Sequence, residues 1–230
     1  METAWFGKGE ATELFVDTGF DRFYDVAVLG SRVVSRLTSQ VALPEKIELP
    51  TDRPLIIAAN HSSLFDLAGA LIFLGHFGLC SRIGVNSRFF TNPAVGAFFR
   101  GLGCVPFSKE DKASAEATMI NALRSGQTAA IMPEGRLIRA KDQVDGVGEG
   151  RPGVSRIARA TDAAVLPIGF AFANEAWNPG TPLPKPRLGR HQIIASVGSP
   201  IVFETDDHIA NANQLMAEIG HLVLEGRQSR

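Results

Sequence analysis

The sequence is poor in cysteine and carries no strong charge of either sign. Its 230 residues include two cysteines, Cys80 and Cys104, which are too few for a disulfide framework. Both have apolar neighbours, so we expect reduced, buried thiols. Neither cysteine has the sequence spacing to a histidine that is typical of metal ligands. We therefore expect no metal site. A formal net charge of −1 gives no reason to expect a nucleic-acid partner.

Long apolar runs are also missing. The longest candidate, residues 67–80, is interrupted by His76 and by glycines, and a bilayer span needs roughly 20 apolar residues. Residues 1–8 are not followed by an apolar run, so we expect no signal peptide. These patterns predict a cytoplasmic protein that is soluble or lies on a membrane surface.

What is present is the composition of an ordinary globular protein, with 45% hydrophobic and 20% charged residues. After a proline-containing linker at 43–54, strand and helix patterns alternate. We predict strands at 55–59, 82–85, 104–107, 128–132, 165–170 and 192–197. We predict helices at 64–77, 93–99, 111–125, 154–160 and 206–225, the last capped by Gly226. Apolar strands alternating with helices indicate an α/β fold with a largely parallel or mixed central sheet flanked by helices.

The chain is expected to form an N-terminal helical segment, residues 1–38, and one globular unit, residues 39–230. Within the first, a helical stripe at 20–37 follows a shorter helical piece at 10–17. The stripe either packs on the core or lies on a membrane, and its few basic residues favour the core. It consists of Phe20, Phe23, Ala27, Gly30, Val34 and Leu37. Residues 178–190 are rich in proline and read as a surface loop.

The heptapeptide NHSSLFD at 60–66 is the most informative stretch of the chain. It joins a predicted buried strand to a predicted helix. Five residues along a regular helix would turn Asp66 about 140° away from His61. If His61 lies in the loop and Asp66 in the first helical turn, the carboxylate can orient the imidazole as a general base.

Other interpretations of this stretch exist. Ser63 and Asp66 match a capping box, a role that is compatible with catalysis. Neither Ser62 nor Ser63 lies in a nucleophile elbow, so we expect no covalent mechanism. The helix that follows Ser63 is expected to offer free backbone amides as oxyanion donors beside His61.

Four further blocks follow in order: GCVPFSK at 103–109, PEGR at 133–136, VLPI at 165–168 and GSPI at 198–201. Together with NHSSLFD they resemble the glycerolipid acyltransferases, the family of bacterial 1-acylglycerol-3-phosphate acyltransferase. The resemblance covers roughly residues 50–203. It implies that His61 and Asp66 are catalytic.

The resemblance also implies an acceptor site. In the PEGR block it assigns Glu134, beside Gly135, to the acceptor's hydroxyl groups and Arg136 to its phosphate. The family usually has one more residue before the arginine, so Arg139 becomes a substitute if the loop turns helically. Lys109 stands where the family usually has a phosphate-binding arginine, and a solvated lysine is an equally good interpretation. Arg151, in the segment GRPG at 150–153, is a further source of positive charge.

These features predict an O-acyltransferase that moves a fatty acyl group to a lysophospholipid, with 1-acylglycerol-3-phosphate as the default acceptor. Acyl-CoA or acyl carrier protein would be the co-substrate, no cofactor is required, and the enzyme would lie peripherally on the inner face of the cell membrane. Another lysophospholipid or a glycolipid acceptor stays open, as do a thioester hydrolase and a lipid-binding module without turnover.

Overall fold

A computed structural model describes residues 3–6, 21–176 and 191–230. The helix predicted at 10–17 and the loop predicted at 178–190 lie outside these ranges. The strands are β1 Thr3–Phe6, β2 Ser39–Ala42, β3 Ile47–Pro50, β4 Leu55–Ala59, β5 Ser81–Asn86, β6 Val105–Phe107, β7 Thr128–Ile131, β8 Ala164–Ala171 and β9 His191–Val197. The helices are α1 Asp21–Thr38, α2 Asp66–His76, α3 Pro93–Gly101, α4 Lys112–Arg124, α5 Gly153–Thr161, α6 Ala173–Ala176 and α7 His208–Gln228, with short 3₁₀ helices η2 Ser87–Phe90 and η3 Ala140–Asp142.

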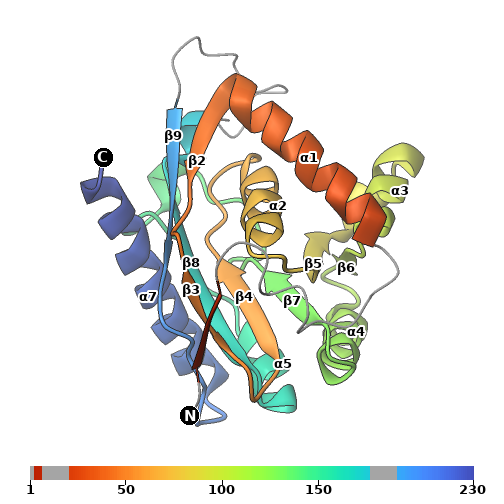
Figure 1. Ribbon diagram of the computed structural model, residues 1–230. Helices are drawn as coiled ribbons and strands as arrows, with labels where there is room; N and C mark the ends of the chain where they lie inside the picture. The colour runs from red at the N-terminus through yellow and green to blue at the C-terminus, as the bar shows by residue number, and fades with distance from the viewer. Residues whose placement is uncertain (1–2, 7–20, 177–190) are drawn as a thin grey trace.

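Seven strands form one sheet in the order β2-β9-β8-β4-β7-β5-β6 (Figure 1). All neighbouring pairs are parallel except β8 and β9, which are antiparallel. The predicted α/β class is therefore confirmed. Strand β4 lies near the middle, between β7 and β8, and is buried along its whole length.

Helices cover both faces of the sheet (Figure 1). Along β4, Leu55, Ile57 and Ala59 join a core with α1, α2 and α3. The alternate residues Ile56 and Ala58 join a second core with α4, α5 and α7. This division follows from the period of two along a strand that is buried on both faces.

Glycines let two of these helices approach closely. A Cβ atom at Gly169 of β8 would lie 2.5 Å from the backbone nitrogen of Val223, so α7 rests directly on the strand. At Gly75 of α2 the same atom would lie 2.5 Å from Val28 of α1. Both positions therefore exclude larger side chains unless the helices move apart.

Several sequence predictions need correction. The three short strands β1, β2 and β3 were missed, and the predicted linker contains β3. Helix α7 also continues past Gly226, which is buried inside it rather than capping it. A Cβ atom there would lie 3.1 Å from Ala171 and 3.2 Å from Ser196, so this glycine serves packing.

The predicted core stripe of α1 is also wrong. The buried side chains are Tyr24, Val28 and Ser35, whereas Phe23 is 41% and Leu37 is 73% exposed. Tyr24 is one residue along from Phe23 of the predicted stripe. The helix is therefore rotated so that a different face packs against the core. In the described ranges, no helix has both the length and the hydrophobicity needed to cross a bilayer.

Candidate active site

The NHSSLFD stretch leaves the carboxyl end of β4, and α2 begins at its last residue. Strands β7 and β8 run parallel to β4 on either side, so the segments that follow all three strands meet at one edge of the sheet. This edge is where α/β sheets commonly bind ligands. The first and third blocks meet at this edge, whereas the fourth block, residues 165–168, lies within β8 and pairs with β4.

His61 and Asp66 form a hydrogen-bonded pair. The distance from His61 Nδ1 to Asp66 Oδ2 is 2.9 Å. The Asp66 side chain is fully buried, and that of His61 is 24% exposed. Because a carboxylate only accepts hydrogen bonds, Nδ1 carries the proton in the neutral ring and Nε2 is left with a free lone pair. The geometry is that of an oriented base.

The same carboxylate oxygen shapes the loop. Asp66 Oδ2 accepts hydrogen bonds from the backbone amides of Ser62 at 2.6 Å and Ser63 at 2.7 Å. The Ser63 hydroxyl in turn accepts from the amide of Phe65 at 3.0 Å. Asp66 therefore binds the Ser63 amide as well as His61. The predicted capping box is not formed, because α2 begins at Asp66 and its N-cap is Phe65 rather than Ser63. The backbone amides of Ser62, Ser63 and Phe65 thus already donate hydrogen bonds within the loop. The expectation that the amides of the first helical turn are free oxyanion donors is therefore wrong for Phe65.

Asn60 has a structural function that the sequence did not reveal. Its side-chain amide donates to the Phe170 carbonyl at 3.1 Å, and its Oδ1 accepts from the Phe170 amide at 2.8 Å. The pair extends the contact between β4 and β8 by one residue through a side chain. It fixes the start of the His61 loop against β8. The one sequence signal for this role was an asparagine directly after a buried strand.

Glu134 holds the His61 loop from the other side, beyond β7. Its Oε1 accepts a hydrogen bond from the backbone amide of His61 at 3.1 Å. The residue is 1% exposed. Burial raises the pKa of the Glu134 carboxyl to about 7, and the charge of Asp66 adds to this, while the His61 amide opposes it. Contact between this carboxylate and His61 was not expected.

Gly135 and Arg151 complete the turn after Glu134. Gly135 has a φ of +63°, a conformation that favours glycine. The Arg151 side chain passes beside it, 3.0 Å from where a Cβ atom would lie. Arg151 Nε donates to the Glu134 carbonyl at 2.9 Å, and its own amide donates to the Pro133 carbonyl at 2.9 Å. Arg151 thus braces the PEGR turn and places positive charge beside it.

The three expected cation positions differ in their surroundings. Arg136 is exposed and directly follows the turn beside His61. Arg139 is extended rather than helical, and its Nε lies 3.2 Å from Asp142, so the expected helical turn is not formed. Lys109 is exposed and follows β6, three strands from β4, which amounts to roughly 14 Å across the sheet.

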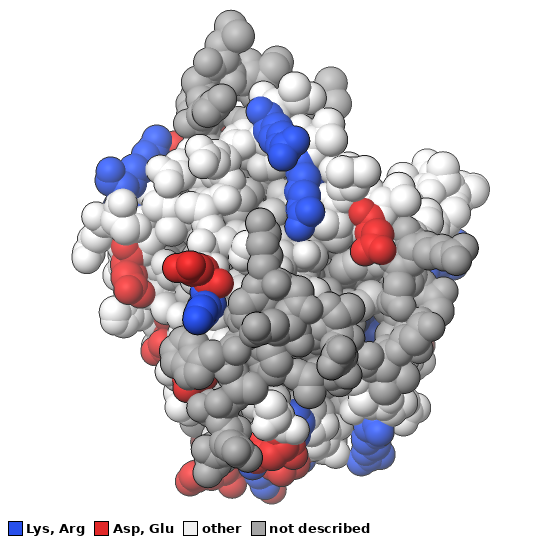
Figure 2. All heavy atoms as spheres, viewed as in Figure 1, with Lys and Arg blue, Asp and Glu red and all other residues white. Residues whose placement is uncertain are grey.

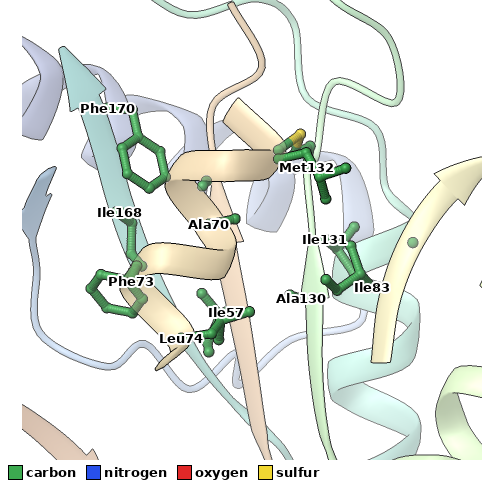
Figure 3. A pocket seen from close by; sticks show the side chains of 13 residues that line it. Ile57, Ala70, Phe73, Leu74, Ile83, Ala130, Ile131, Met132, Ile168 and Phe170 are labelled. Carbon is green, nitrogen blue, oxygen red and sulfur yellow. The ribbon is translucent and has the colours of Figure 1, made fainter. Parts of the chain in front are cut away.

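An apolar pocket lies between α2 and the sheet (Figure 3). Two of its lining residues, Ala59 and Leu67, are within two positions of His61 and Asp66 in the sequence. The rest of the wall is formed by Ala70, Phe73 and Leu74 of α2, by residues of β4, β5, β7 and β8, and by Met132, which follows β7. The described residues contain no cluster of three or more His, Cys, Asp or Glu side chains that could bind a metal.

Residues 40–171 match the family model named Acyltransferase, which covers more than half of the chain. The chain belongs to the Acyltransferase family. It is therefore an O-acyltransferase, and the matched range contains every site residue described above. No curated protein matches this sequence.

A solved structure has the same fold. It is the 1-acyl-sn-glycerophosphate (LPA) acyltransferase PlsC from Thermotoga maritima, with a TM-score of 0.67 and 22% sequence identity. The similarity covers 95% of this chain and 86% of that one. The acyltransferase fold thus extends over nearly the whole chain.

The pKa of Glu134 predicts how the stability of this acyltransferase depends on pH. A carboxyl group with a raised pKa binds more protons in the folded state, so stability falls as pH rises from about 4.5 to about 7. The loss is on the order of 3 kcal/mol at most, since one pKa unit corresponds to about 1.4 kcal/mol. Glu134→Gln should remove this loss. Its unfolding free energy relative to the parent should rise over that pH range in urea titrations.

Glu149→Gln is the control, because Glu149 is an exposed acid in a nearby loop. It should leave the pH dependence of stability nearly unchanged. A difference between Glu134→Gln and the parent that stays flat from pH 4.5 to 8 would contradict the raised pKa.

Proposed function

We propose that this acyltransferase moves a fatty acyl group from acyl-CoA or acyl carrier protein to a hydroxyl group of a lysophospholipid, with 1-acylglycerol-3-phosphate as the acceptor. The observation that carries the proposal is the His61–Asp66 pair beside an apolar pocket. Its Nδ1–Oδ2 distance is 2.9 Å. The family match supports acyl transfer, and the similarity in fold to a 1-acyl-sn-glycerophosphate acyltransferase supports the choice of acceptor.

His61 is the general base in this proposal. Its Nε2 takes the proton of the acceptor hydroxyl while the hydroxyl oxygen attacks the thioester carbonyl. Asp66 stabilises the imidazolium that forms. When the tetrahedral intermediate collapses, the carbon–sulfur bond breaks, and the imidazolium returns its proton to the leaving thiolate. A thioester is already activated, so these residues need no cofactor for this step.

The apolar pocket is the proposed site of the acyl chain. Its lining is almost entirely aliphatic or aromatic, with Phe73 and Phe170 as the largest side chains (Figure 3). Each methylene group removed from water contributes about 0.8 kcal/mol, so such a wall favours an acyl chain over a polar group. Because Ala59 and Leu67 adjoin the catalytic residues, a chain in the pocket would hold its thioester near His61.

The direct test is incubation of the pure protein with a labelled acyl-CoA and a panel of lysolipids, followed by identification of the product. Formation of phosphatidate from 1-acylglycerol-3-phosphate supports the proposal. Thiol release that is independent of any acceptor would instead indicate a hydrolase. Binding of lipid without product would indicate a module that has lost turnover.

His61→Ala should abolish most of the transfer, because positioned acid–base groups contribute on the order of 10²–10⁴ in rate. Asp66→Asn should also reduce kcat strongly, since the ring loses its anionic partner. His221→Ala on α7, an exposed histidine far along the chain from the site, is the control and should retain activity. Activity of His61→Ala within a few-fold of the parent, with an unchanged melting temperature, would refute the base assignment.

The acceptor's phosphate is proposed to bind Arg136 above all. Arg136 is exposed and follows the turn that contacts His61, whereas Lys109 lies three strands away and Arg139 is paired with Asp142. Arg151 adds charge to the same turn. An arginine can also bind phosphate through two parallel hydrogen bonds, which lysine cannot do.

Arg136→Ala should therefore raise the acceptor KM roughly ten- to hundred-fold, since a charge-assisted hydrogen bond is worth about 1.5–3 kcal/mol. The acyl-CoA KM should stay nearly constant. Lys109→Ala should have a smaller effect, and Arg139→Ala the smallest, because its charge is already neutralised by Asp142. Equal effects of all three substitutions would show that this ranking is wrong.

The outer face of α1 is the proposed contact with a membrane surface. Of the twelve large hydrophobic side chains that are exposed in the described residues, six belong to α1 and two, Val95 and Phe98, to α3. The rings of Phe23 and Phe98 lie 5.9 Å apart, so the two helices share one apolar surface. Figure 2 shows a largely uncharged surface over α1 on which basic side chains lie. Lysophospholipids reside in bilayers, and anionic headgroups would attract this basic charge.

Leu29→Glu on α1 should weaken sedimentation with anionic vesicles by about tenfold or more, because burying a leucine contributes about 1.5–3 kcal/mol. Leu29 is 62% exposed. Ile209→Glu on α7 is the matched control at 68% exposure and should bind like the parent. Equal losses for both variants would argue that vesicle binding depends on charge alone.

A further inference from the structure

We propose that Glu134 is a positioning residue for acyl transfer, which holds the general base His61 in place through its main chain. The inference rests on the proposed function of His61. It gives Glu134 a role different from contact with the acceptor's hydroxyl groups, which the resemblance to glycerolipid acyltransferases implied.

The loop after β7 holds the His61 backbone by both of its polar groups. Glu134 Oε1 accepts from the His61 amide at 3.1 Å. The His61 carbonyl accepts from the amide of Ile138 at 2.8 Å. Residues 134 and 138 belong to one segment. This segment therefore fixes the position and the orientation of the His61 backbone, from which the imidazole projects.

Burial directs the Glu134 carboxylate toward the loop and away from solvent. The residue is 1% exposed, and its Oε2 has no hydrogen-bond partner among the described residues. Its Cγ would lie 3.2 Å from a Cβ atom at Gly148, so the segment around Gly148 closes over it. A substrate hydroxyl has no surface of this carboxylate to reach in this conformation.

The His61 loop needs such an anchor because it lies between regular elements. Asp66 orients the ring and binds the amides of Ser62 and Ser63, but Asp66 itself stands at the start of α2. Asn60 attaches the other end of the loop to β8. Without Glu134, the amide of the half-buried His61 would lose this hydrogen-bond partner. A displacement of about 1 Å at the reacting atoms can cost on the order of 10² in rate.

The first test compares two substitutions. Glu134→Ala removes the acceptor for the His61 amide and should lower kcat roughly hundred-fold, with each KM changed less than about three-fold. Glu134→Gln keeps a carbonyl oxygen in the same place and should restore at least roughly a tenth of the parent kcat. A rise in the acceptor KM with a nearly normal kcat, in both variants, would overturn the proposal in favour of direct acceptor binding.

The second test is a double-mutant cycle with His61. If Glu134 acts through His61, Glu134→Ala should lower the residual rate of His61→Ala by less than about two-fold. Losses that multiply would show that Glu134 acts independently of the base and would contradict the proposal. Should Glu134→Ala fail to fold, Glu134→Asp replaces it, because its shorter side chain cannot span the 3.1 Å contact without a shift of the loop.

A third readout does not depend on activity. In NMR spectra, Glu134→Ala should shift the imidazole signals of His61 and leave those of the exposed His221 unchanged. The control, Glu149→Ala, should leave the signals of both histidines unchanged. Unchanged His61 signals in Glu134→Ala would overturn the positioning role even in an active enzyme. Shifted signals in a protein whose parent form transfers no acyl group would instead refute the proposed function alone.

Discussion

The site depends on hydrogen bonds that attach one short loop, the loop after β4, to the two strands on either side of β4. Strand β4 ends at Ala59, after which no ladder continues. Asn60 ties the next residue to β8 by two hydrogen bonds, and Glu134 ties His61 to the segment after β7. Because β7 and β8 lie on opposite sides of β4, these contacts hold the loop from both sides. The position of His61, the proposed base, therefore depends on the order of the strands in the sheet.

Helix α2 contacts both His61 and the apolar pocket. Its first residue, Asp66, orients the imidazole, and Leu67, Ala70, Phe73 and Leu74 of the same helix form one wall of the pocket. One helix thus sets the direction of the His61 ring and forms part of the pocket proposed for the acyl chain. The close approach of Val28 to Gly75 holds this helix under α1. Packing between α1 and α2 thereby supports the geometry of the His61–Asp66 pair.

Local patterns predicted the central strands, because apolar runs bounded by turns suffice to mark a strand buried on both faces. They missed β2 and β3, whose four residues are too few for a pattern to be recognised. The pairing of His61 with Asp66 followed from the chain's ability to fold back over five residues. The contact between Glu134 and His61 spans 73 positions, and only the parallel pairing of β4 with β7 brings them together. Which face of α1 is buried likewise depends on the elements that pack against it.

The sequence departs from the family's motifs at Lys109 and in the shortened PEGR block, and the sheet order shows that the second departure lies closer to His61. Lysine in place of arginine at position 109 affects a residue that follows β6, three strands from the strand that leads to His61. The shortened PEGR block matters more, because Arg136 follows directly on the turn that touches His61. Arg151 crosses Gly135 and donates to the Glu134 carbonyl, which keeps a second guanidinium at this turn. Arg136 and Arg151 thus both lie at the turn that contacts His61, and the proposed phosphate site at this turn would not depend on an arginine at position 109.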